Sequence, residues 1–119
     1  MYGHKQARES GTDTVFVVEG EIDCLYLWSI GVPAVATFGA SITRRQLNQL
    51  MRYKHVVIAT DNDGAGVMFR NKLMEMLIPT CHVSVLSFPR QYKDVNEIPK
   101  HQLKGYCRDK VRAVVPTFM

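Results

Sequence analysis

The chain has 119 residues, of which 46% are hydrophobic and 22% are charged. This length and composition are typical of one globular domain with a single core. The apolar runs are short and interrupted by charges, which excludes a transmembrane helix, and the polar start MYGHKQARESGTDT lacks the apolar segment of a secretory signal. We therefore expect a cytoplasmic protein that does not enter a membrane.

The net charge bears on the binding partner of the chain, and the cysteine spacing bears on disulfides and zinc binding. The net charge of +4 fits a polyanionic partner such as nucleic acid without requiring one. The cysteines Cys24, Cys81 and Cys107 are far apart and form no CxxC pair, which predicts reduced thiols and excludes both a disulfide framework and a sulfur-bound zinc site.

Two segments lie outside the expected domain. Residues 1–13 are polar and predict a flexible lead-in, whereas residues 99–119 predict a basic extension that can be helical.

From residue 14 onward, apolar strands alternate with amphipathic helices. The expected strands are TVFVVEG, VPAVATFG, HVVIATD and CHVSVLSFP, and the expected helices are EIDCLYLWSIG, SITRRQLNQLMR and GAGVMFRNKLMEMLIP. This alternation predicts an α/β domain over residues 14–98, with a mostly parallel sheet of about four strands and helices on both faces.

Acidic residues follow three of the expected strands. Glu19 ends the first strand, Asp61 and Asp63 end the third, and Asp94 follows the fourth. Because functional groups gather beyond the carboxyl ends of parallel strands, these side chains should share one edge of the sheet. Converging carboxylates repel one another and lose hydration, and a hard cation that prefers oxygen ligands removes that conflict. The pattern therefore predicts a site for Mg²⁺ or Mn²⁺.

A purely structural role explains part of the same pattern. Asp61-Asn62-Asp63-Gly64 can form a turn in which Asp63 caps the following helix. Gly64 and Gly66 open a helix whose N-terminus attracts anions, and glycine allows close approach of a ligand at Gly39 as well. Asp23 can either orient metal-bound water or act as a first-turn acid favoured by the helix dipole.

Together these residues resemble a Toprim domain, the module shared by primases, topoisomerases and some nucleases. The family pattern is a glutamate and glycine after the first strand and an Asp-x-Asp pair after the third, here Glu19-Gly20 and Asp61-Asn62-Asp63. The resemblance covers residues 14–98. The segments VVEGEIDCL and AVATFGASIT are similar to the primase versions of this domain, and YKDVNEI resembles the Lys-Asp-x-Asn-Glu segment of phage-type primase–helicases and their mitochondrial relatives. The resemblance is therefore to a bacterial-type or phage-type primase.

The resemblance implies a Toprim (Rossmann-like) fold and a function. That function is metal-dependent nucleotidyl transfer in a DNA primase, which makes RNA primers on a single-stranded DNA template from nucleoside triphosphates. Asp61 and Asp63 would be metal ligands and catalytic residues, Asp94 a further ligand, and Glu19 the general base or acid or a ligand of a second metal. Phosphate or nucleotide contacts would come from Gly20, Gly39, Gly64, Gly66 and Lys93.

Arg44 and Arg45 would contact nucleic acid, although a solvated helix face is the simpler explanation for them. The sequence contains no zinc-binding module and no P-loop, so we expect part of a larger primase or a small Toprim protein that works with other primase domains and a replicative helicase. Two alternatives remain, a Toprim nuclease and a non-catalytic module that binds metal or nucleic acid.

Overall fold

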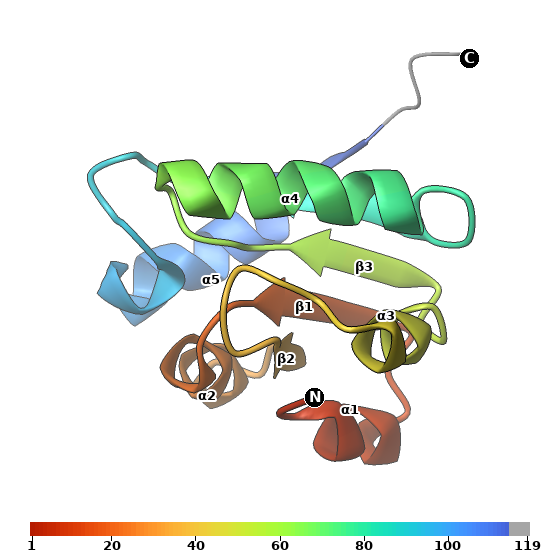
Figure 1. The fold of residues 1–119 in the computed structure, drawn as a ribbon. Coiled ribbons are helices and arrows are strands. Elements are labelled where there is room, and N and C mark those ends of the chain that lie inside the picture. The colour runs from red at the N-terminus through yellow and green to blue at the C-terminus, as the bar shows by residue number, and fades with distance from the viewer. Residues whose placement is uncertain (115–119) are drawn as a thin grey trace.

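A five-stranded sheet forms the centre of the computed structural model, which describes residues 1–114 (Figure 1). The strands lie in the order β2-β1-β3-β4-β5; β1 to β4 are parallel, and β5 is antiparallel to β4. The strands are β1 Thr14–Val18, β2 Ala34–Ala36, β3 His55–Ile58, β4 His82–Leu86 and β5 Val111–Ala113. The helices are α1 His4–Ser10, α2 Glu21–Ser29, α3 Arg44–Leu50, α4 Gly64–Leu77, the 3₁₀ helix η1 Val95–Glu97 and α5 Lys100–Asp109.

Helices cover both faces of this sheet. Phe16 and Val18 of β1 pack in one apolar cluster with residues of α2, η1 and α5, while Val15 and Val17 pack in a second cluster with residues of α1, α3 and α4. Alternate residues of a strand point to opposite faces, so strands covered on both sides need continuous apolar runs such as these. The predicted mostly parallel sheet with helices on both faces is confirmed.

The order in which successive strands join the sheet changes direction at β1 and β3. From the central β1 it first adds β2 on one side and then crosses to add β3 and β4 on the other. Because β1 and β3 are parallel neighbours, with Val17 opposite Ile58, the segments that follow them begin side by side. Such a switch point is the usual ligand site of an open α/β sheet.

Two segments outside the predicted domain form structure that the sequence did not predict. The expected flexible lead-in contains α1, whose Ala7 is fully buried, and the Tyr2 carbonyl accepts a hydrogen bond of 3.0 Å from the Ala36 amide. In the expected extension, α5 is helical, and β5 adds a fifth strand to the sheet of about four that the sequence predicted; residues 115–119 of that extension lie outside the described residues. No helix within residues 1–114 is long and apolar enough to span a bilayer.

Gly66 in the first turn of α4 lies against the loop that follows β3. A Cβ atom at this position would be 2.1 Å from the Asp61 carbonyl oxygen, far inside contact distance. The Gly66 carbonyl also accepts a 3.0 Å hydrogen bond from the buried Thr60 hydroxyl. The close approach of helix and loop therefore requires glycine here.

We expect Gly66→Ala to lower the free energy of unfolding by at least about 2 kcal/mol, because a backbone atom cannot move aside as a flexible side chain can. Gly64→Ala is the matched control: it lies in the same turn, no atom lies within 4 Å of its added Cβ, and alanine favours the helix by up to about 1 kcal/mol. Urea unfolding of the three proteins measures both effects. Equal stability of the two variants would contradict the required close approach.

Candidate metal centre at the carboxyl edge of the sheet

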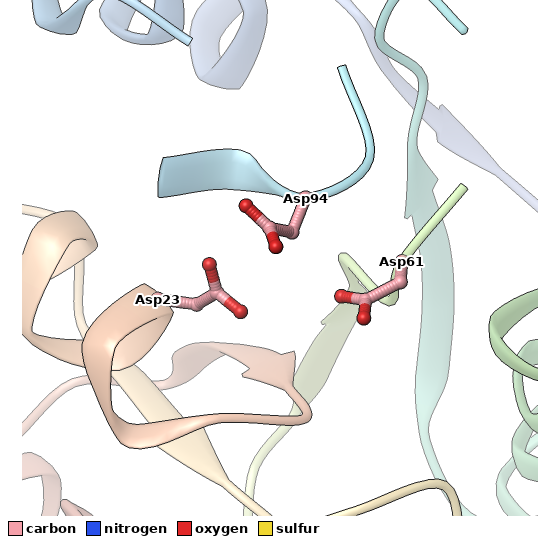
Figure 2. Close-up of side chains that lie close together, drawn as sticks. All are labelled: Asp23, Asp61 and Asp94. Atoms are coloured by element: carbon pink, nitrogen blue, oxygen red, sulfur yellow. The ribbon is translucent and has the colours of Figure 1, made fainter. Parts of the chain in front are cut away.

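Three aspartates converge beyond the carboxyl ends of β1 and β3. Oxygen atoms of Asp23, Asp61 and Asp94, one from each, all lie within 4.8 Å of one another. Figure 2 shows that their side chains come from three separate segments and turn toward a common space. Asp23 belongs to the first turn of α2, Asp61 follows β3, and Asp94 precedes η1.

Asp23 is held in place by the segment that carries Asp94. Its side chain is buried, and Oδ1 accepts hydrogen bonds from Asn96, 2.8 Å from the side-chain amide and 3.2 Å from the backbone amide. These bonds join α2 to η1 and fix the spacing between Asp23 and Asp94. The second oxygen of Asp23 makes no hydrogen bond to the described residues and can serve as a ligand.

Glu19 links the ends of the two central strands. Its Oε2 accepts a 2.8 Å hydrogen bond from the Asp61 backbone amide. The Glu19 side chain also lines, with the three aspartates, an open hollow of about 540 Å³. Glu19 therefore positions Asp61 and adds a fourth acidic group to the same site.

The loop that carries Asp61 is tied to the loop that leads to Asp94. The Asn62 backbone amide donates to the Lys93 carbonyl over 2.6 Å. The Asn62 side-chain amide donates to three backbone carbonyls of the segment after β4, those of Phe88, Pro89 and Tyr92. Asn62 thus fixes one loop against the other, so the separation of Asp61 and Asp94 is set by the backbone.

The convergence raises the pKa of all three aspartates. Burial first, and then the charges of Glu19, Asp23, Asp94 and Asp63, raise the pKa of Asp61 from 3.8 to about 7. Burial and the neighbouring Asp94 raise the pKa of Asp23 to about 6. The pKa of Asp94 is raised by burial and by the charge of Glu97. Each carboxylate therefore ionises less readily than a free aspartate unless a cation balances its charge.

A buried oxygen without a partner shows that the site fits a cation. Asp94 Oδ1 is the one buried side-chain oxygen or nitrogen in residues 1–114 that lacks a hydrogen-bond partner. An unsatisfied buried acceptor is costly, and a bound divalent cation would remove that cost. Three carboxylates form the all-oxygen donor set that hard divalent cations prefer. Asp23, Asp61 and Asp94 therefore suit such an ion.

Asp63 lies outside this group and caps α4. Its Oδ1 accepts a 2.7 Å hydrogen bond from the Gly66 amide, as the alternative of a turn and helix cap predicts. The assignment of Asp63 as a metal ligand and catalytic residue stays a prediction. The Gly66 amide is likewise occupied by this bond, whereas Gly64 is exposed at the start of the helix.

The other residues predicted to contact phosphate or nucleic acid lie at different places on the surface. Gly20 and Gly39 line the hollow that contains the aspartates. Lys93 is exposed, and its backbone amide donates to a Glu97 carboxylate oxygen. Arg44 and Arg45 are exposed on α3 and line a separate hollow together with His4, Asn48, Gln49 and Arg52.

Sequence reasoning missed Asn62 and Asn96 as positioning residues, and it left Asp23 undecided. Asn96 stands in the YKDVNEI segment and Asp23 in VVEGEIDCL, so both lie in motifs that signal the site. Their pairing across 73 residues has no local signature.

Known proteins resemble this chain over most of its length. A family model described as Toprim-like matches residues 16–98. The DNA primase of Enterococcus faecalis is 33% identical over 98 residues, which are 79% of this chain and 16% of that protein. The DNA primase of Thermotoga maritima is 36% identical over 111 residues, which are 91% of this chain and 19% of that protein.

A solved structure agrees with these relatives. The zinc-binding and RNA polymerase domains of the Aquifex aeolicus primase superpose with a TM-score of 0.74 at 26% identity, covering 95% of this chain and 29% of that one. The chain spans less than a fifth of the two primases that it matches in sequence. The predicted resemblance to primase Toprim domains is confirmed, and because the family model covers residues 16–98, the chain belongs to the Toprim-like family.

Proposed function

We propose that this chain is the magnesium-dependent nucleotidyl-transfer core of a DNA primase, which makes RNA primers on single-stranded DNA. The observation that carries the proposal is the convergence of Asp23, Asp61 and Asp94 at the switch point between β1 and β3, with one buried oxygen lacking a partner. The similarity to two DNA primases supports the reaction and its substrates.

The roles of the acidic residues follow from their positions. Asp61 and Asp94 hold the cation, and Asp23 contributes the oxygen that does not bind Asn96. Asp63 would contribute only through the oxygen that does not cap α4. A bound Mg²⁺ supplies charge that offsets the negative charge of the phosphates during transfer. Glu19, at the wall of the hollow, accepts the proton of the 3′-hydroxyl that attacks the α-phosphate of the incoming nucleoside triphosphate, and pyrophosphate leaves.

The partners follow from the same reaction. Nucleoside triphosphates place their phosphates at the carboxylate site, where Gly20 and Gly39 leave the backbone accessible and Lys93 adds positive charge. The template strand binds through basic residues such as Arg44 and Arg45, whose charges neutralise phosphates. Further primase domains and a replicative helicase complete the assembly in a cytoplasmic replication complex.

Replacing Asp61 tests the metal site directly. We expect Asp61→Asn to weaken Mg²⁺ or Mn²⁺ binding at least about tenfold, since even residues that only support a metal ligand typically contribute that much. Asp63→Asn should weaken binding less, because asparagine keeps the helix cap. The exposed Glu75→Gln on α4 is the matched control and should bind as the wild type does. Calorimetric titration measures all four proteins.

The metal affinities of Asp61→Asn and Asp63→Asn together decide whether Asp63 is a ligand. If Asp63→Asn weakens binding as strongly as Asp61→Asn, then Asp63 is a ligand, as the sequence predicted, and the structural group of three is incomplete. Full metal binding by Asp61→Asn would contradict the proposed site.

The raised pKa values predict how stability depends on pH when a chelator removes all metal. Asp61 has a pKa of about 7 in the folded state and 3.8 in the unfolded state, so the folded state holds the proton more tightly. Its contribution to stability is fully present below about pH 4 and is lost as pH rises toward 7. Asn cannot ionise and does not lose this contribution.

We therefore expect Asp61→Asn to be more stable than the wild type at about pH 8, by a margin larger than at about pH 5. Urea unfolding in EDTA at both pH values measures the margin, with Glu75→Gln as the control. Adding Mg²⁺ at the higher pH should stabilise the wild type but not Asp61→Asn. A margin that does not change with pH would contradict the raised pKa of Asp61.

Primer synthesis tests the proposed reaction. Residues 16–98 replace the matched segment of the Thermotoga maritima primase, and the chimera is assayed for labelled RNA on single-stranded DNA with Mg²⁺. We expect primers from the chimera and from its Glu75→Gln variant, and a loss of about hundredfold or more in its Asp61→Asn variant. Circular dichroism and Mg²⁺ titration verify that each chimera folds. Shortened nucleic acid in place of primers would contradict the proposal and indicate a nuclease.

A further inference from the structure

Phe38 has an unusual backbone for its residue type. It follows β2, its φ is 65°, and it is the one non-glycine residue of residues 1–114 with a positive φ. A bulky side chain in this left-handed region is a genuine outlier, because the Cβ atom crowds the backbone. Strain of this kind persists where the surrounding structure enforces it, and it concentrates at ligand sites.

The hydrogen bonds around Phe38 enforce this conformation. The Thr37 amide donates to the carbonyl of the last residue of β1 over 3.1 Å, and the Gly39 amide donates to the Glu19 carbonyl over 3.0 Å. The Thr37 hydroxyl donates to the Gly39 carbonyl over 2.7 Å, and the Gln46 side chain donates to the Thr37 carbonyl over 3.2 Å. The position of Phe38 is therefore fixed relative to Glu19 and to the carboxylate site.

The Phe38 side chain contributes little to the core. It is 62% exposed, and its ring makes one aromatic contact, edge to face with Tyr2 at a centroid distance of 5.8 Å. Phe38 lines the same hollow as Asp23 and Asp61, and Ile22, which is 65% exposed, lines it as well. Apolar side chains thus lie on the wall of a hollow that contains the acidic site.

We propose that Phe38 is a stacking platform for a nucleobase whose nucleotide has its phosphate at the carboxylate site. This inference rests on the proposed function and deepens it by naming what recognises the base. Nucleic-acid-binding proteins stack bases on exposed aromatic rings, and every base offers a flat face for such a contact. The enforced backbone of residues 37–39 keeps the ring on the wall of the hollow and away from the core.

The stacked base has two chemical sources, a nucleoside triphosphate or a residue of a single strand. The ligands used in the test separate them. ATP with Mg²⁺ offers a base and a phosphate chain, inorganic triphosphate with Mg²⁺ offers the phosphate chain alone, and a thymidine oligonucleotide and its abasic counterpart offer the strand with and without bases.

The experiment measures the binding of these ligands to the intact chain and to four variants, Phe38→Ala, Phe38→Trp, Met68→Ala and Asp61→Asn. We expect Phe38→Ala to weaken binding of ATP or of the thymidine oligonucleotide about five- to hundredfold, and to leave inorganic triphosphate and the abasic strand unchanged. Phe38→Trp, which keeps an aromatic ring, should bind ATP or the thymidine oligonucleotide as the wild type does. Met68→Ala, which truncates another exposed apolar side chain, on α4 and outside the hollow, should change nothing.

Each outcome decides the proposal. Equal binding of ATP and of the oligonucleotide by Phe38→Ala and the wild type would overturn it, and so would an equal loss of inorganic triphosphate binding, which would show an effect on loop shape instead of stacking. Asp61→Asn separates this failure from that of the proposed function, because it should weaken both ATP and inorganic triphosphate. If Asp61→Asn weakens neither, or if the wild type binds neither, the proposed function fails as well.

Discussion

The hydrogen bond from the Asp61 amide to the Glu19 carboxylate joins the ends of two parallel strands whose neighbouring positions create the site. Because β1 lies between β2 and β3, the segments after β1 and β3 diverge and leave room for a ligand. The aspartates enter this space from α2, from the loop after β3 and from the segment before η1. If β1 and β3 were not neighbours, Glu19 and Asp23, which follow β1, would not meet Asp61, which follows β3.

Bringing the carboxylates together opposes folding. Two unit charges 4.8 Å apart repel one another by on the order of 3 kcal/mol at the effective dielectric constant of a protein surface. Burial raises the pKa values of Asp23 and Asp61, and this repulsion raises them further. The two apolar clusters on the faces of the sheet offset it, and the hydrogen bonds of Asn62 and Asn96 keep the acidic groups from moving apart. The site thus exchanges stability for the capacity to bind a cation, as functional sites commonly do.

Both acidic and apolar residues line the hollow, and they suit different parts of a ligand. The carboxylates suit an ion and the phosphates that accompany it, while Phe38 and Ile22 present apolar surface beside them. Asp61 and Phe38 stand on loops that hydrogen bonds hold in place, while Asp23 and Ile22 stand on the first turn of α2, so ligand binding needs little further ordering of the chain. The arrangement suits a ligand that is anionic at one end and flat and apolar at the other, as a nucleotide is.

The sequence by itself determined the strands, the order of helices and strands, and the acidic edge, because apolar runs and their period are local properties. It did not reveal α1, which buries a single alanine and so has no apolar stripe, or β5, whose three residues gain order only by pairing with β4. It also assigned Asp61, Asp63 and Asp94 to one metal site and left Asp23 undecided. Asp63 fits both a cap and a ligand in a local pattern, and only the tertiary structure turns it to Gly66 while Asn96, 73 residues away, holds Asp23 in the group. Local patterns determine which residue types end a strand, but distances between side chains depend on contacts between segments that are far apart in the sequence.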